Sequence, residues 1–108
     1  MKRKAFTLVE IMIVILLISI LAGIAVPNFL RSRDSSRTRT CISSLRAIED
    51  AKEMWAMAEK QPAGAACVVG NLVPDYLKML RVCPSGGTYD LKTVGERTAC
   101  SIGTPHAL

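Results

Sequence analysis

The first quarter of the chain carries an almost unbroken run of apolar residues. Between Phe6 and Val26 the exceptions are Thr7, Glu10, Ser19 and Gly23. As a helix, these 21 residues would extend about 30 Å, which is enough to cross the hydrocarbon core of a bilayer. The pattern therefore predicts a membrane-spanning helix that contains one carboxylate, Glu10. Such a carboxylate costs about 2.5–3.5 kcal/mol to insert and normally has a partner.

A helical pattern continues beyond the apolar run, because residues of one face recur every three or four positions. We expect Met54 and Trp55 to lie in the core, and Glu49 to form a weak surface ion pair with Lys52. The face consists of Cys41, Leu45, Ile48, Lys52, Trp55 and Ala58, with Ala47, Ala51 and Met54 beside them.

One helix is predicted to contain both patterns, from Phe6 to Lys60, and to end before Pro62 and Gly64. Its 55 residues would extend about 80 Å. Pro27 lacks the N–H group that would bond to the carbonyl of Gly23. We therefore predict a kink or a locally unwound stretch at Gly23 and Pro27.

The segment after the helix has fewer than fifty residues. A segment this short needs cross-links or support from the helix to form a core. We predict an α+β fold, in which a small antiparallel sheet of two or three strands packs on the long helix. The expected order is a loop over Gln61–Asn71, an apolar connection over Leu72–Leu77, a turn at Cys83–Gly87, a strand over Thr88–Lys92, a turn at Val94–Arg97 and a returning strand over Thr98–Ile102.

The residues around Glu10 carry a family resemblance. The basic stretch Lys2-Arg3-Lys4 and the small residue Ala5 precede Phe6-Thr7-Leu8-Val9-Glu10. This arrangement resembles the processing site of type IV prepilins and of the pseudopilins of type II secretion. In that family a basic leader ends in a small residue, usually Gly, and the fifth mature residue is a Glu. The apolar helix that ends at Pro27 matches the same family, and the departure is Ala5 in place of Gly.

The resemblance implies that a prepilin peptidase cleaves after Ala5 and methylates the new amino terminus at Phe6. It divides the chain into a leader (1–5), a transmembrane and filament-core helix (6–27), an amphipathic helix (28–60) and a small head (61–108). The precursor would span the inner membrane once, with its amino terminus in the cytoplasm. An inner-membrane assembly platform would then add it to a periplasmic or extracellular filament by helix packing.

Glu10 acquires a specific role from this resemblance. In a filament it would meet the amine of Phe6 in a neighbouring subunit. A subunit docked at the wrong height would leave two unpaired buried charges, so we expect this pair to select the axial register. The resemblance alone does not separate a pilus subunit from a secretion pseudopilin.

Two other interpretations remain open. Lys2-Arg3-Lys4 together with Gly23-Ile24-Ala25 also fits a secretory signal, although Glu10 lies where such a signal is most apolar. The mature protein would then begin at Val26 and not at Phe6. Alternatively, the chain is a membrane-anchored or secreted binding module whose disulfide-linked head is the active part and which forms no filament.

Four cysteines, Cys41, Cys67, Cys83 and Cys100, lie in the head or just before it. No two of them form a C-x-x-C pair and His106 is the only histidine, so a tetrahedral zinc site would need all four cysteines at irregular spacing. We therefore predict up to two disulfides in an oxidising compartment, with three connectivities open, and no metal site.

The sequence contains no Ser/His/Asp set and no phosphate-binding glycine loop. His106 stands near the end of the chain, where we expect it to be exposed. We therefore predict neither an enzyme nor a cofactor. Calcium is the weaker alternative, with Asp90 and Glu96 as ligands, because two carboxylates fall short of the 6–8 oxygen atoms that this ion takes.

The formal net charge of +5 falls to +2 when the leader is removed with its three cationic residues. A basic cluster remains after the apolar run, but stacking on nucleic-acid bases requires aromatic side chains and only Phe29 lies nearby. We expect the cluster to contact lipid headgroups or neighbouring subunits, and not nucleic acid. Its members are Arg31, Arg33, Arg37 and Arg39, opposed by Asp34.

Overall fold

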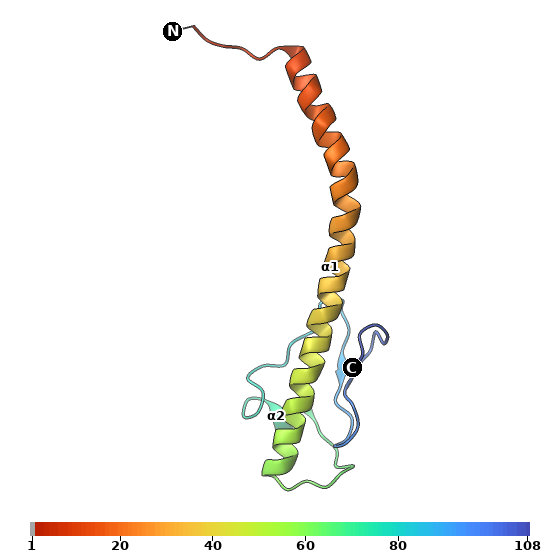
Figure 1. Cartoon of the computed structure of the whole chain (residues 1–108). Coiled ribbons are helices and arrows are strands. Elements are labelled where there is room, and N and C mark those ends of the chain that lie inside the picture. Colours follow the sequence, from red (N-terminus) through yellow and green to blue (C-terminus); the bar gives the residue numbers. More distant parts are fainter. Residues whose placement is uncertain (1) are drawn as a thin grey trace. The chain divides into compact units, whose positions relative to one another are not determined.

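The structure is a computed structural model that describes residues 2–108, so Met1 of the predicted leader lies outside the described residues. It divides into two compact units, one up to Asp34 and one from Ser35 onward. Helix α1 (Leu8–Ala58) contributes residues to both units. The remaining elements belong to the second unit and are α2 (Val69–Leu72), β1 (Tyr89–Asp90) and β2 (Ala99–Cys100) (Figure 1).

Helix α1 begins with a side-chain cap. The Thr7 Oγ1 atom accepts a hydrogen bond from the backbone N–H of Glu10 at 3.2 Å, and the Thr7 carbonyl accepts one from Ile11. Thr7 and Glu10 thus occupy the Ser/Thr and Glu positions of a capping box, and the Glu10 charge lies in the first turn, where the helix dipole favours it. The helix therefore starts two residues later than predicted, and Phe6 precedes it.

Helix α1 continues without interruption through Gly23 and Pro27. An unwound stretch at Gly23 and Pro27 is therefore not present in the single chain, and the alternative of a kink stays a prediction. The hydroxyl group of Ser19 is satisfied within the helix, because it donates to the Ile15 carbonyl at 2.7 Å. This bond lowers the cost of a polar side chain in apolar surroundings.

The carboxyl-terminal part of α1 is the spine of the second unit. The predicted buried face is confirmed at Trp55 and at most of its other positions, but Met54 is 51 % exposed, so its assignment to the core was wrong. Ala47 and Ala58 are exposed as well. The buried residues of this face are Cys41, Ser44, Leu45, Ile48, Ala51, Lys52 and Trp55.

The predicted hairpin is confirmed in a shorter form. β1 and β2 pair antiparallel, with Tyr89 opposite Cys100 and Asp90 opposite Ala99. The end of the predicted loop over residues 61–71 and the first residue of the predicted connection form α2, a single helical turn that the sequence pattern did not indicate. Figure 1 shows these segments lying along the carboxyl-terminal part of α1.

The core of the second unit consists of two apolar clusters on α1. The first is centred on Trp55, and the apolar connection Leu72–Leu77 packs into it as predicted. Cys41 and Leu45 belong to the second, together with Cys83 and Cys100. Both clusters combine residues of α1 with residues of the head, so the head has no core of its own.

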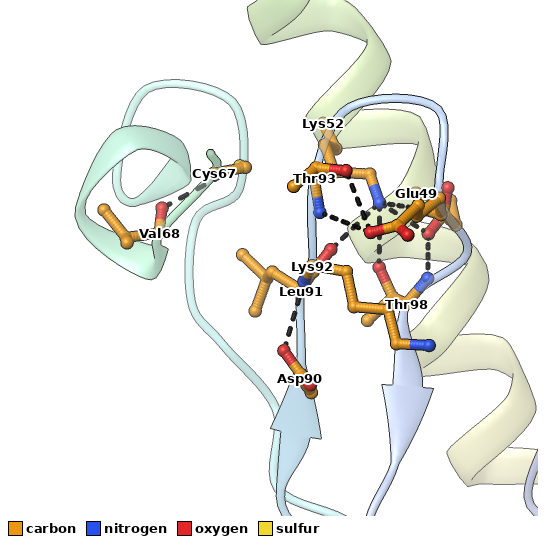
Figure 2. Close-up of polar contacts among 10 residues, drawn as sticks. Glu49, Lys52, Cys67, Val68, Asp90, Leu91, Lys92, Thr93 and Thr98 are labelled. Carbon is orange, nitrogen blue, oxygen red and sulfur yellow. Dashed lines mark hydrogen bonds and ion pairs between the residues drawn. The ribbon is translucent and has the colours of Figure 1, made fainter. Parts of the chain in front are cut away.

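Lys52 links the hairpin to α1 through a buried ammonium group (Figure 2). Its Nζ atom donates to Glu49 Oε1 at 2.9 Å, to the carbonyl oxygens of Leu91 at 3.0 Å and Glu96 at 2.5 Å, and to Thr98 Oγ1 at 3.4 Å. The Glu49 carboxylate also accepts a hydrogen bond from the backbone N–H of Thr98. The predicted ion pair between Glu49 and Lys52 is therefore confirmed, but its expected position on the surface was wrong, because the hairpin covers Lys52.

Replacing Lys52 with Met should destabilise the second unit by about 3 kcal/mol, since the volume is kept while a partly buried carboxylate and two carbonyl groups lose their donor. Denaturant unfolding of the full chain in detergent, followed by the fluorescence of Trp55, measures this change. Lys78→Met removes an exposed lysine and should change stability by less than about 0.5 kcal/mol. Equal effects of the two substitutions would contradict a structural role for Lys52.

Acid should destabilise the second unit through Glu49. Burial acts to raise the pKa of this carboxyl group, but hydrogen bonds from Thr98 and Lys52 outweigh burial and hold its pKa below the ordinary value of 4.5. A lowered folded-state pKa means that the stabilisation is fully present above about pH 4.5 and is lost as the pH falls through the folded-state pKa.

The Glu49→Gln variant should therefore lose less stability than the wild-type chain on acidification below this pH. Thermal unfolding at stepwise lower pH measures the difference. The exposed Glu59→Gln variant is the control and should keep the wild-type pH dependence. An unchanged pH dependence in Glu49→Gln would contradict the assignment.

Candidate functional site

The apolar amino-terminal part of α1 has no partner within the single chain. Every residue from Lys2 to Ser36 is exposed. The large apolar side chains of this stretch show exposed fractions from 46 % at Val14 to 79 % at Phe6. Within residues 2–108, α1 is the one helix long and apolar enough to cross a membrane. Such a surface must be covered by lipid or by apolar helices of other molecules, because burial gains about 1.5–3 kcal/mol for each large side chain.

The predicted processing residues lie together at the start of this unit. Ala5 and Phe6 are exposed and precede the helix, so a peptidase could reach the bond between them. Glu10 is exposed in the first helical turn. Phe6 precedes the helix, so Phe6 and Glu10 do not lie on a common helical face in the unprocessed chain. Cleavage, methylation and charge pairing at these residues stay predictions.

A second candidate site is buried in the unit that begins at Ser35. The sulfur atoms of Cys41, Cys83 and Cys100 and a ring nitrogen of His106 lie within 4.8 Å of one another. We call these four residues the Cys/His cluster. Cys41 comes from α1, Cys83 from the turn before β1, Cys100 from β2, and His106 from the carboxyl-terminal segment. The prediction that His106 is exposed was therefore wrong, since its side chain is 6 % exposed.

Hydrogen bonds orient His106 within the cluster. Its Nδ1 atom lies 3.6 Å from the Cys83 Sγ atom, and its Nε2 atom lies 3.3 Å from Thr38 Oγ1 on α1. The backbone N–H of His106 donates to the Gly103 carbonyl, which closes a turn after β2 and brings the ring back to the helix. The sequence offered no local signal for this placement, because 65 residues separate Cys41 from His106.

The thiols of the cluster differ in acidity. Burial, together with hydrogen bonds to Cys83 and Cys100, raises the pKa of Cys41 to about 12. Burial also acts to raise the pKa of Cys83. Hydrogen bonds from the backbone N–H groups of Ser85 and Gly87, and from the Cys41 and His106 side chains, outweigh burial and lower this pKa to about 7. Of these two thiols, Cys83 is therefore the one that more readily becomes a thiolate.

Cys67 lies outside the cluster. It is buried with Trp55 and Leu72 in the first apolar cluster, and burial raises the pKa of its thiol. Figure 2 shows it beside α2. All four cysteines are free thiols in the structure, so the predicted disulfides and their connectivity stay predictions.

The two carboxylates considered for calcium make local hydrogen bonds. Asp90 accepts from the backbone N–H of Lys92, and Glu96 accepts from the hydroxyl and backbone N–H of Thr93. The hydrogen bonds from Thr93 lower the pKa of Glu96, and the hydroxyl group of Thr93 has the larger effect. The geometry accounts for both carboxylates as turn-stabilising groups, and calcium binding stays untested.

Comparison with known proteins agrees with the amino-terminal features. The family model for the prokaryotic N-terminal methylation motif matches residues 1–26. The type II secretion system core protein G of Klebsiella pneumoniae is 34 % identical, over 94 % of this chain and 82 % of that protein. The corresponding protein of Vibrio cholerae is 32 % identical, over 95 % of this chain and 80 % of that protein. The type IV major pilin protein PilA of Myxococcus xanthus is 26 % identical, over 96 % of this chain but 48 % of that protein. No solved structure gives a significant match.

Proposed function

Because this chain belongs to the type IV pilin-like family, which includes the type II secretion pseudopilins, we propose that it is made as an inner-membrane precursor and becomes a filament subunit after loss of residues 1–5. The exposed apolar part of α1 is the observation that supports this most strongly. Lipid covers it in the precursor, and the same part of neighbouring subunits covers it in the filament. One apolar surface thus serves both states, because lipid chains and packed apolar helices are similar environments.

The secretion pseudopilus is the better supported of the two machines. This chain covers about four fifths of the core protein G relatives but about half of the longer major pilin. We therefore assign the chain to a periplasmic pseudopilus, with a surface pilus as the alternative.

Processing should create the partner that Glu10 requires. The precursor has Lys2, Arg3 and Lys4 beside the apolar run, and the family resemblance places its amino terminus in the cytoplasm until cleavage. Cleavage after Ala5 moves a positive α-amine to Phe6, at the edge of the apolar segment. An amine and a carboxylate that enter the filament core together avoid the cost of two separate buried charges.

The mature protein should begin at a methylated Phe6. N-terminal sequencing and the intact mass of the membrane-extracted chain measure this directly. Ala5→Leu should block cleavage, because a pocket that accepts a small residue excludes a branched side chain, whereas Ala5→Gly should be cleaved at least as well as the wild-type chain. A mature protein that begins at Val26 would instead establish an ordinary secretory signal.

The Glu10→Val variant should remain inserted in the membrane and be processed at Phe6, but filament recovery should fall at least about tenfold, the effect of losing 1.4 kcal/mol of subunit affinity. Ser19→Val is the matched control. It also removes a polar group from the apolar run, but the Ser19 hydroxyl bonds only within its own helix. Filaments recovered from the periplasm would support the pseudopilus, and fibres sheared from the surface the pilus. Normal filament recovery from Glu10→Val would contradict the pairing of Glu10 with Phe6.

A further inference from the structure

We propose that the Cys/His cluster of Cys41, Cys83, Cys100 and His106 is a structural zinc site that fastens the hairpin and the carboxyl terminus to α1. Three sulfur atoms and one imidazole nitrogen are a ligand set that zinc takes in closed tetrahedral sites. All four side chains are buried, with exposed fractions from 0 % at Cys41 to 6 % at Cys100 and His106. Four protein ligands leave no open position for a substrate, so the site is structural and not catalytic.

The distances fit this assignment. Zinc bonds of about 2.3 Å to sulfur and 2.0–2.1 Å to nitrogen place the two ligand atoms of a tetrahedral site roughly 3.6 Å apart. The separation of Cys83 Sγ and His106 Nδ1 is 3.6 Å. No separation between ligand atoms in the cluster exceeds 4.8 Å, so each has to contract by at most about 1 Å to reach the spacing of a tetrahedral site. Side-chain rotations in the turn and the carboxyl-terminal segment supply a movement of this size.

The groups around the cluster are those that support metal ligands. Thr38 Oγ1 lies within hydrogen-bond distance of His106 Nε2, so the ring can donate there while Nδ1 faces the sulfur atoms. The backbone N–H of Gly86 donates to the Cys83 carbonyl at 3.0 Å and closes the turn that carries the Cys83 ligand. The buried Tyr89 hydroxyl packs against the cluster without a hydrogen-bond partner. A Cys41 thiolate is a better acceptor for this hydroxyl than a neutral thiol.

The absence of a side chain at Gly87 makes room for the Cys/His cluster. A Cβ atom at this position would lie 2.7 Å from the Cys100 sulfur and 3.0 Å from the Ile102 side chain. The turn after Cys83 therefore brings its backbone against Cys100 only because residue 87 has no side chain. This close approach places the turn and β2 at the distance that a shared ion requires.

Zinc accounts for the cluster better than disulfides do. Three thiols cannot all pair with one another, and a disulfide between two of them leaves the third buried beside His106 without a role. Cys67 would have to leave the first apolar cluster, where it packs with Trp55, to form a second disulfide with the remaining thiol. Binding of one Zn²⁺ to three thiolates and one neutral imidazole uses all four groups and releases up to three protons.

The test uses the full processed chain, purified in detergent without reductant and without chelator. Elemental analysis and native mass spectrometry should find one zinc ion per chain. Cys41→Ser, Cys100→Ser and His106→Gln should each lose most of the zinc. Cys67→Ser is the matched control, since it removes a buried cysteine outside the cluster, and it should retain the metal. Fluorescence of Trp55, the only tryptophan, reports whether each variant keeps a folded head.

Cobalt binding keeps the test decisive if a ligand variant fails to fold. The wild-type chain, exchanged into Co²⁺, should give the visible absorption bands of tetrahedral cobalt and a thiolate charge-transfer band. The proposal is overturned if the wild-type chain holds no zinc and gives no such bands, if Cys67→Ser loses zinc as the ligand variants do, or if the purified chain contains a disulfide between two cysteines of the cluster.

Discussion

The ammonium group of Lys52 is the interaction on which the second unit depends. A buried positive charge is stable only where oxygen atoms replace the water it has lost. Glu49 supplies such atoms from the same helix, and the hairpin supplies the others from Leu91, Glu96 and Thr98 (Figure 2). The hairpin has strands of two residues, which are too short to persist alone in water. The Lys52 contacts therefore orient the hairpin on α1. The first apolar cluster, which contains Trp55 and Leu91, lies beside these hydrogen bonds and shields them from water.

Helix α1 meets two different environments along its length. Its carboxyl-terminal part is amphipathic and buries one face under the head, so its partner is encoded in the same chain. Its amino-terminal part is apolar on all sides, and no residue from Lys2 to Ser36 is covered. A helix that is apolar all round is stable only inside a bilayer or a larger assembly. This difference fits the family to which the chain belongs, because the apolar surface of the amino-terminal part has to be covered by other molecules.

The sequence predicted the fold where local periodicity decides it. The apolar run, the amphipathic face, the apolar connection at Leu72–Leu77 and the antiparallel hairpin are all present. The helix boundaries differed from the prediction by two residues, because caps such as Thr7 determine them and not the apolar pattern. Periodicity does not decide the burial of Met54 and Trp55. They are adjacent on the helix, yet the head covers only Trp55, and the path of the head is not a periodic property of α1.

The sequence by itself determined which family the chain belongs to and that its first unit needs partners. The motif from Ala5 to Glu10 and the apolar run are contiguous, and a contiguous pattern needs no tertiary information to be read. Only the tertiary structure decided that Lys52 is buried and that Cys41, Cys83, Cys100 and His106 converge. These residues are up to 65 positions apart, and their meeting depends on how the turns at Cys83–Gly87 and after β2 direct the chain back to α1. A polar side chain is buried when another segment of the chain covers it. That segment is distant in sequence, so the residues next to the side chain do not reveal it.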